Sequence, residues 1–148
     1  MKAIVQRVKN AHVTVDDTMI SSIETGLVVL LGVAHGDTEK DAKYLVDKII
    51  NLRIFEDDHK KMNRSLLDVN GELLVVSQFT IMADCRKGRR PSFTDAAPPE
   101  PACRLYRFFA EKAASLGVRV KKGKFQANMN VSLVNQGPVT LILESPKN

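Results

Sequence analysis

The plainest pattern in the chain is the apolar run GLVVLLGV at residues 26–33. A short apolar run between glycines predicts a strand covered on both faces, although a short buried helix has the same pattern. Two segments rich in Ile and Val, residues 2–9 and 12–15, come before it. They predict a pair of strands that are joined tightly at Asn10-Ala11.

Two later segments carry apolar residues at helical spacing. Thr38, with Asp41 three residues later, predicts a helix start of the capping-box type. A second helix is predicted after Pro101, with Gly117 just beyond its end. Each helix has one apolar stripe and one polar face, so we expect it to lie on a sheet. The stripes are Ala42, Leu45, Val46, Ile49 and Leu52 in the first helix, and Leu105, Phe109, Ala113 and Leu116 in the second.

The remaining patterns predict further strands. Residues 65–80, SLLDVNGELLVVSQFT, are typical of a hairpin with Asn70-Gly71 at its turn. Residues 125–134 alternate between apolar and polar, which predicts a half-exposed strand. Residues 139–143 then close the sheet after a Gly-Pro turn. These elements together predict a single α/β domain in layers, with the helices gathered on one side.

Composition and charge add a partner class but no definite partner. The chain has 148 residues, with 22 basic and 17 acidic side chains and a net charge of +5. Such a balance suits RNA, but many proteins that bind no RNA share it. Its two cysteines have no C-x-x-C spacing, which suits a reducing compartment. Charges interrupt the apolar N-terminal segment, so we expect a cytoplasmic protein that is not in a membrane.

Catalytic signatures are scarce. The chain has no G-x-S-x-G, H-E-x-x-H, Walker or G-x-G-x-x-G motif. Ser77 and Thr80 at the end of a predicted strand are either nucleophiles or hydroxyls that tie down the backbone. Gln78 between them offers a neutral amide for a polar ligand, or is an ordinary exposed residue.

Two basic clusters offer contacts for a polyanion. The first lies in residues 83–101, which are polar and proline-bearing and predict a long surface loop. Clusters of this kind attract backbone phosphates, although a solvated loop has the same composition. The first cluster consists of Arg86, Lys87, Arg89 and Arg90 beside Phe93, and the second of Lys121, Lys122 and Lys124.

Gly137-Pro138 is an unusual pair between two strand-forming segments. An X-Pro bond adopts the cis form at a cost of only about 0.5–1 kcal/mol relative to trans. A cis bond would turn two rigid carbonyls the same way, and such carbonyls would reject a ligand of the wrong shape. A plain tight turn is the alternative reading of the same residues.

Several motifs, taken together, resemble the D-aminoacyl-tRNA deacylase family. SQFT and NxGPxT are short individually, but their order and separation in a chain of this length are specific. The similarity runs from the first residue to about Ser145. The motifs are MKAIVQRV at 1–8, LLGV at 30–33, DTEKD at 37–41, NLRIFED at 51–57, LLVVSQFT at 73–80, KGRRPSF at 87–93 and NQGPVT at 135–140.

This resemblance implies a fold of two stacked β-layers with helices on one side, and a homodimer with active sites at its interface. It implies hydrolysis of the ester between a D-amino acid and the terminal ribose of tRNA, with glycyl-tRNA mischarged on tRNA-Ala as a secondary substrate. The activity serves proofreading and recycling in translation, and the resemblance implies no metal or cofactor.

The resemblance also assigns residues. Ser77, Gln78, Phe79 and Thr80 would form one wall of the pocket, and Gly137 and Pro138 would enter the partner's pocket as a Gly-cisPro chiral filter. Arg7 would brace that filter, Phe125 and Met129 would line the pocket, and the basic loop would contact tRNA. Gln126 and Asn128 depart from the family pattern, where a glycine and an acidic residue are usual.

Two questions stay open at the level of sequence. Main-chain N–H groups near Phe79 and Thr80 would stabilise the oxyanion, with help from the ribose 2′-hydroxyl, or Thr80 would be a covalent nucleophile. An RNA-binding module without catalysis and a small-molecule-binding dimer are the alternatives to an enzyme.

Overall fold

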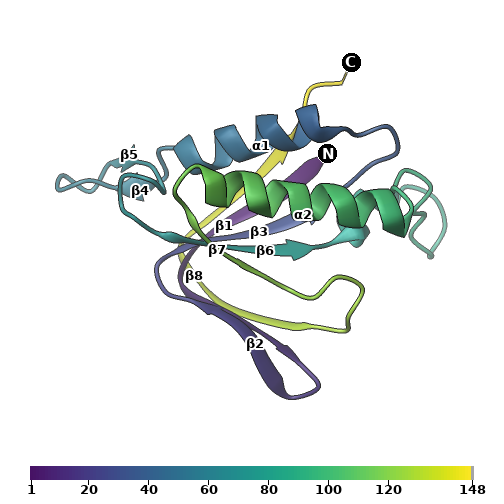
Figure 1. Ribbon diagram of the computed structural model, residues 1–148, viewed down its shortest axis with the longest axis horizontal. Helices are drawn as coiled ribbons and strands as arrows, with labels where there is room; N and C mark the ends of the chain where they lie inside the picture. The colour runs from purple at the N-terminus through teal and green to yellow at the C-terminus, as the bar shows by residue number, and fades with distance from the viewer. Residues whose placement is uncertain (148) are drawn as a thin grey trace.

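The structure is a computed structural model that describes residues 1–147. It has the predicted α/β class, with two helices on one side of the sheet (Figure 1). The helices are α1 (Glu39–Asn51) and α2 (Pro99–Ser115), and η1 (Phe79–Met82) is a short 3-10 helix. The strands are β1 (Lys2–Val15), β2 (Thr18–Ile23), β3 (Gly26–Gly32), β4 (Phe55–Glu56), β5 (Met62–Arg64), β6 (Glu72–Ser77), β7 (Arg119–Lys122) and β8 (Asn130–Glu144).

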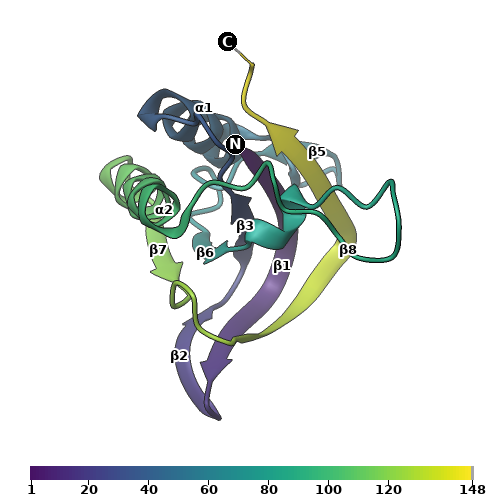
Figure 2. The ribbon, with the colours of Figure 1, turned by 90° about the vertical axis from the view of Figure 1, so that its right-hand side faces the viewer.

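Six strands form one curved sheet that nearly closes into a barrel (Figure 2). Its order is β2-β1-β3-β6-β7, and β8 pairs with β1. The β3, β6 and β7 strands are parallel, whereas β1 pairs antiparallel with β2, β3 and β8. The Ser21 hydroxyl on β2 donates a hydrogen bond to the Lys122 carbonyl on β7, which joins the two ends of the sheet.

The curvature gives the sheet two buried faces. Along β3, Leu27, Val29 and Leu31 pack toward the helices, whereas Val28 packs into the hollow of the sheet. This alternation explains why GLVVLLGV is apolar throughout, and it confirms the prediction of a strand covered on both faces. Burial of both faces removes several large side chains from water, at roughly 25 cal/mol per Å² of apolar surface.

The helices begin and end for local reasons. Thr38 caps α1, and Thr38 and Asp41 exchange hydrogen bonds as a capping box, which confirms the prediction. The α2 helix begins at Pro99, three residues earlier than predicted, because proline is tolerated in a first helical turn. Gly117 follows its end with φ +94°. Neither helix of residues 1–147 has the length and apolar character to span a membrane.

The first two predicted strands are one strand, so the prediction of a tight connection at Asn10-Ala11 is wrong. Asn10 is exposed and does not adopt the positive φ of a two-residue turn. The strand instead changes neighbours there. Residues Lys2 to Val8 pair with β3, and Ala11 to Val15 pair with β2.

The predicted hairpin over residues 65–80 is also wrong. Asn70 has φ +52°, as a turn requires, but Ser65 to Asn70 form compact turns instead of a strand. The Ser65 N–H donates to the Asp68 carboxylate, and the Asp68 N–H donates back to the Ser65 hydroxyl, at 2.8 and 3.1 Å. The second arm, β6, pairs in parallel with β3 and β7.

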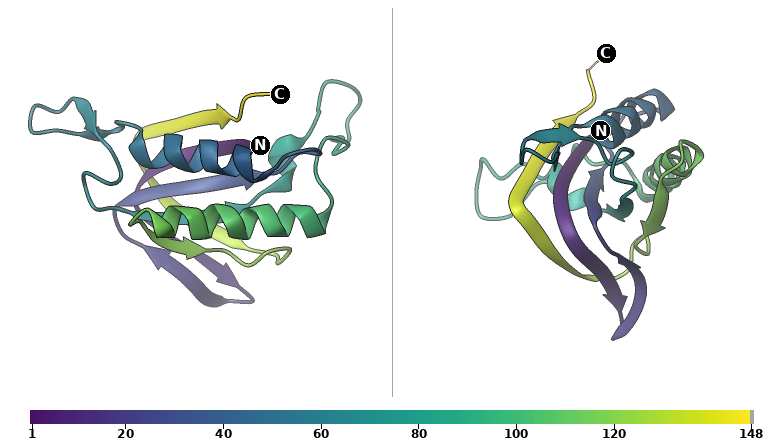
Figure 3. Two further views of the ribbon diagram at one scale, coloured as in Figure 1. Left: turned by 45° about the horizontal axis from the view of Figure 1, so that its top comes forward. Right: turned by 90° about the vertical axis from the view of Figure 1, so that its left-hand side faces the viewer.

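The C-terminal third of the chain differs from the prediction in where its last strand begins and in the absence of a turn that divides it. Lys124 to Ala127 form a turn, and the strand predicted from residue 125 begins at Asn130. Gly137-Pro138 is not a turn between two strands, since β8 runs through it. The strand bends beside β1 instead (Figure 3).

Candidate functional site

The Ser77–Thr80 segment lies where the parallel strands β3 and β6 end. The Gln78 N–H donates to the Leu31 carbonyl at 2.8 Å, and the chain then turns into η1. Ser77 and Gln78 are half-buried, whereas Phe79 and Thr80 are exposed. Carboxyl ends of parallel strands commonly hold ligands, because loops and helix starts present free polar groups there.

This segment presents donors rather than a strong base. Phe79 and Thr80 are the first two residues of η1, and their N–H groups have no acceptor among residues 1–147. The Gln78 side-chain amide donates to the Thr80 hydroxyl oxygen. Two free main-chain N–H groups on one exposed turn can stabilise negative charge on a carbonyl oxygen.

The basic loop lies beside this segment. The Phe79 and Phe93 rings are 5.0 Å apart and meet edge to face. The loop closes at its base, where Asp84 and Ser92 exchange main-chain hydrogen bonds at 2.8 and 2.9 Å. The structure therefore brings the predicted phosphate contacts close to the predicted pocket wall.

The four basic side chains of the loop are not equivalent. Arg86 forms two side-chain hydrogen bonds with the Asp84 carboxylate, at 2.9 and 2.8 Å, and these bonds lower the pKa of Asp84 to about 2. Lys87, Arg89 and Arg90 are exposed and form no ion pair within residues 1–147. Those three remain open to a polyanion, whereas the Arg86 charge is already compensated.

Met129 lies near the same strand ends, and Phe125 lies further toward α2. A Cβ on Gly123 would lie 2.8 Å from the Met129 sulfur and 3.7 Å from Val76, the residue before Ser77. The Phe125 ring packs against Tyr106 of α2, with 6.0 Å between centroids. Gln126, the first of the two departures, has φ +62°, a conformation that glycine adopts at little cost.

Tyr106 was not predicted from the sequence. Its hydroxyl donates to the Val75 carbonyl at 3.0 Å and contacts the Gly123 carbonyl at 3.4 Å. Burial raises its pKa to about 12, so it stays a donor. It ties α2 to β6 just before Ser77. A tyrosine on an otherwise apolar helix stripe was the available signal, since a buried hydroxyl needs a partner.

Gly137 and Pro138 lie in a wide bulge of β8. Val8 pairs with Asn135 and Gln6 pairs with Thr140, so Arg7 alone faces the four residues Gln136 to Val139. The Gly137-Pro138 bond is cis, and both residues are exposed. Buried Arg7 donates from Nε to the Gln136 carbonyl at 3.1 Å and from Nη1 to the Ile54 carbonyl at 2.7 Å.

Within one chain the two predicted parts of the site are far apart. Arg7, at the bulge, pairs with Leu27, whereas Ser77 aligns with Leu31 and Ala3. Along the strands, the position of Arg7 and the position of Ser77 differ by four residues, about 13 Å. Across the sheet, β8 and β6 are three strands apart, about 14 Å. One chain therefore does not bring Gly137-Pro138 against Ser77–Thr80.

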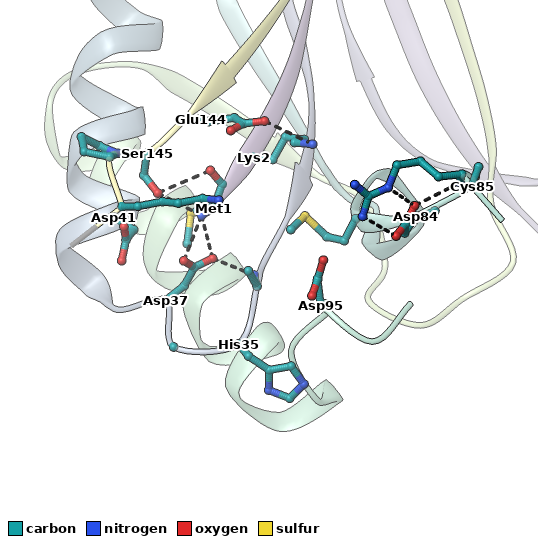
Figure 4. Close-up of a pocket in the computed structure, with 17 residues that line it drawn as sticks. Met1, Lys2, His35, Asp37, Asp41, Asp84, Cys85, Asp95, Glu144 and Ser145 are labelled. Carbon is teal, nitrogen blue, oxygen red and sulfur yellow. Dashed lines mark hydrogen bonds and ion pairs between the residues drawn. The ribbon is translucent and has the colours of Figure 1, made fainter. Parts of the chain in front are cut away.

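A cleft of about 790 Å³ lies beyond η1 (Figure 4). The Met1 ammonium lies there, 2.8 Å from the Asp37 carboxylate and 2.9 Å from the Ser145 hydroxyl. Asp84 and Arg86 line its other side. Of the predicted site residues only Arg86 lines this cleft. The cleft is therefore not the pocket that the sequence predicts. Among residues 1–147 no cluster of three or more His, Cys, Asp or Glu is placed to hold a metal ion.

Comparisons with known proteins match the chain over almost its whole length. A family model described as D-Tyr-tRNA(Tyr) deacylase matches residues 4–144. A D-aminoacyl-tRNA deacylase of Geotalea uraniireducens (strain Rf4) is 60% identical over 148 residues, which is 100% of this chain and 96% of that protein. One of Thermosipho africanus (strain TCF52B) is 57% identical over 147 residues, 99% of each chain.

Two solved structures are similar as well. The c-Myc DNA Unwinding Element Binding Protein superposes with a TM-score of 0.94 and 46% identity, over 99% of this chain and 100% of that one. A probable eukaryotic D-amino acid tRNA deacylase has a TM-score of 0.83 and 18% identity, over 97% and 98%. The second likeness concerns the fold alone. The fold, with its curved sheet and two helices on one side, is thus shared across low sequence identity.

Proposed function

Because the chain belongs to the D-aminoacyl-tRNA deacylase family, we propose that Ser77–Thr80 is where it cleaves the ester between a D-amino acid and the terminal ribose of tRNA. The family's activity makes the chain a hydrolase of aminoacyl-tRNA esters. The observation that carries the location is the pair of free N–H groups on Phe79 and Thr80, beside an exposed aromatic ring.

The proposed chemistry uses main-chain groups. Water attacks the ester carbonyl, the N–H groups of Phe79 and Thr80 stabilise the oxyanion, and the ribose oxygen leaves with a proton. The neighbouring ribose 2′-hydroxyl is placed to assist. The Thr80 hydroxyl accepts a hydrogen bond from Gln78, and in this proposal it helps to hold the turn and does not act as a nucleophile.

We assign the selection of D-aminoacyl esters to the second chain of a homodimer. In a homodimer, Gly137 and Pro138 of one protomer would enter the pocket of its partner, where their carbonyls leave no room for an L side chain. Three observations support this arrangement: the dipeptide is exposed, it stands in a bulge, and its own Ser77–Thr80 segment is far away. The buried guanidinium of Arg7 would fix its direction.

The same exclusion predicts a second substrate. Glycine has no side chain, so a filter that works by side-chain collision cannot reject it. We therefore include glycyl-tRNA, and the family resemblance implies that it is tRNA-Ala mischarged with glycine. We assign the protein to proofreading and tRNA recycling in the cytoplasm. Phosphates of the tRNA would contact Lys87, Arg89 and Arg90, and less so Arg86, while Phe125 and Met129 complete the pocket.

One assay tests the proposal against its alternatives. The wild-type protein is incubated with D-tyrosyl-tRNA and with L-tyrosyl-tRNA, and loss of the ester is followed. Release from the D form alone supports the deacylase. Protection of both esters without release would indicate a nucleic-acid-binding module, a role that the name of the 46% identical DNA-binding relative suggests. No effect on either ester would leave a small-molecule-binding dimer.

A further inference from the structure

The bulge in β8 lacks the bonds that normally hold a strand. Between the pairs Val8 with Asn135 and Gln6 with Thr140, four residues of β8 face one residue of β1. The regular ladder therefore cannot fix the main chain of Gln136 to Val139. Side chains have to supply the missing bonds, since unpaired backbone groups in a strand leave its direction undetermined.

The Asn135 side chain supplies bonds at the base of the bulge. Its Oδ1 accepts a hydrogen bond from the Val139 N–H at 3.2 Å, and its Nδ2 donates to the Thr140 hydroxyl oxygen at 2.9 Å. One amide thus joins the paired residue before the bulge to the last residue of the bulge and to the paired residue after it. Only a side chain with both a donor and an acceptor can make this pair of bonds.

Thr140 connects this clamp to β1. Its hydroxyl oxygen accepts from the Asn135 amide and, at 3.4 Å, from the Gln6 amide. Arg7, the neighbour of Gln6, holds the Gln136 carbonyl from the other side of the bulge. The loop that carries Gly137 and Pro138 is therefore held by side chains at both of its ends.

We propose that Asn135 and Thr140 are positioning residues that set the direction of the Gly137 and Pro138 carbonyls, and so determine the selectivity for D over L esters. This inference rests on the proposed function, because it takes Gly137-Pro138 as the filter. The two residues act through the main chain of Val139 and do not touch the ester.

The test compares isosteric variants. Thr140→Val removes the hydroxyl and keeps the shape, Asn135→Leu removes both polar groups, and Thr140→Ser restores the hydroxyl. We expect the ratio of kcat/KM for D-tyrosyl-tRNA to that for L-tyrosyl-tRNA to fall about tenfold in the first two, which corresponds to about 1.4 kcal/mol. Thr140→Ser should keep the wild-type ratio. If Asn135 and Thr140 act as one unit, the double variant loses no more than the larger single loss.

Thr14→Val is the matched control. Thr14 lies at the other end of β1, opposite Asn130. Its replacement by valine makes the same chemical change far from the bulge. It should leave the ratio unchanged. A wild-type ratio in Thr140→Val, or an equal loss in Thr14→Val, would overturn the proposal. A wild type that does not discriminate between the two esters would instead reject the proposed function itself.

A second measurement needs no variant. In the wild-type protein Val139 lies within the bulge and has no Cα partner on β1, and its amide donates to the Asn135 side chain. We expect this amide to exchange with deuterium at least about tenfold more slowly than a free amide, as a closed hydrogen bond requires. Exchange at the rate of a free amide would overturn the clamp whatever the variants do.

Discussion

At Gly137 one hydrogen atom takes the place where any other residue has a Cβ. A Cβ there would lie 2.9 Å from Nη2 of Arg7 and 3.0 Å from Cγ2 of Val139, and the residue has φ +124°. We predict that Gly137→Ala lowers the free energy of unfolding by about 1–3 kcal/mol through backbone strain. Because Arg7 must also move, the D over L selectivity should fall. Urea denaturation and the tyrosyl-tRNA assay measure the two effects.

Gly117→Ala separates the effect of backbone strain from the effect of the contact between residue 137 and Arg7. Gly117 has φ +94°, but a Cβ there would meet nothing within 4 Å. This variant should lose a comparable amount of stability and keep its selectivity. Equal loss of selectivity in both variants would show that general destabilisation, and not the contact with Arg7, is responsible.

Thr80 distinguishes the two mechanisms of ester cleavage. Its hydroxyl accepts the Gln78 amide, and its N–H is one of the two free donors. We predict that Thr80→Ala, which keeps the N–H, retains turnover to within about tenfold of wild type, since one neutral hydrogen bond is worth only about 1 kcal/mol. Single-turnover kinetics measure this. Near-complete loss with tRNA binding intact, together with a trapped acyl-enzyme in the wild type, would establish Thr80 as a nucleophile.

At the scale of elements, the basic loop predicts a salt effect. Arg89 and Arg90 have no acidic partner among residues 1–147, whereas Arg86 is held by Asp84. Replacing Arg89 or Arg90 by Ala should weaken binding about equally across tRNA species and reduce the slope of log affinity against log salt by about 1. Arg86→Ala is the internal control and should change the slope less. An unchanged slope for Arg89→Ala and Arg90→Ala would place the tRNA elsewhere.

The start of α1 predicts a dependence of stability on pH. Burial raises the pKa of Asp41, but hydrogen bonds from Thr38 and Ser145 and the nearby N-terminal ammonium outweigh it, and the net shift is downward. A carboxyl whose pKa is lowered by folding contributes stability above its unfolded pKa, about 3.9, and loses it as the pH falls through the folded value. We expect Asp41→Asn to cost about 1 kcal/mol at pH 7 and much less at pH 2, measured by urea denaturation. An equal cost at both pH values would exclude the carboxylate as the cause.

These elements differ in how far the sequence could predict them. The capping box of α1 and the apolar stripe from Ala42 to Ile49 are local signals, and both are confirmed, whereas Leu52 lies just past the end of the helix. The length of β1 and the parallel pairing of β6 depended on distant strands, which periodicity does not report. For the site, the motifs pointed to Ser77–Thr80 and Gly137-Pro138, but the bulge and Tyr106 follow from contacts distant in sequence. The Asn135 clamp is local, yet its bonds need the bulge to bring Val139 and Thr140 back to Asn135. Gln126 has φ +62°, a conformation that a glycine at this position would adopt at less cost.

At the scale of the whole molecule, one chain exposes apolar side chains around both parts of the proposed site. Phe79 is 55% exposed, and Ile142 on β8, the strand that carries the bulge, is 69% exposed. Large apolar side chains in such positions favour burial against another surface. This exposure agrees with the proposal that a second chain completes each site.

Mixed dimers test whether each site takes residues from two chains. One chain carries Phe79→Glu, which spoils the pocket wall at an exposed position, and the other carries Gly137→Ala, which spoils the filter. If the filter acts in trans, the only intact wall in the mixed dimer faces the only intact filter, so the dimer should cleave D-tyrosyl-tRNA and reject the L form as wild type does. If the filter acts in cis, the surviving wall keeps its own damaged filter, and the mixed dimer should be as unselective as the Gly137→Ala homodimer. The separation in one chain, about 13 Å along the strands and three strands across, favours the first result. Two affinity tags purify the mixed species, and its ratio of kcat/KM values for the two esters decides between the arrangements.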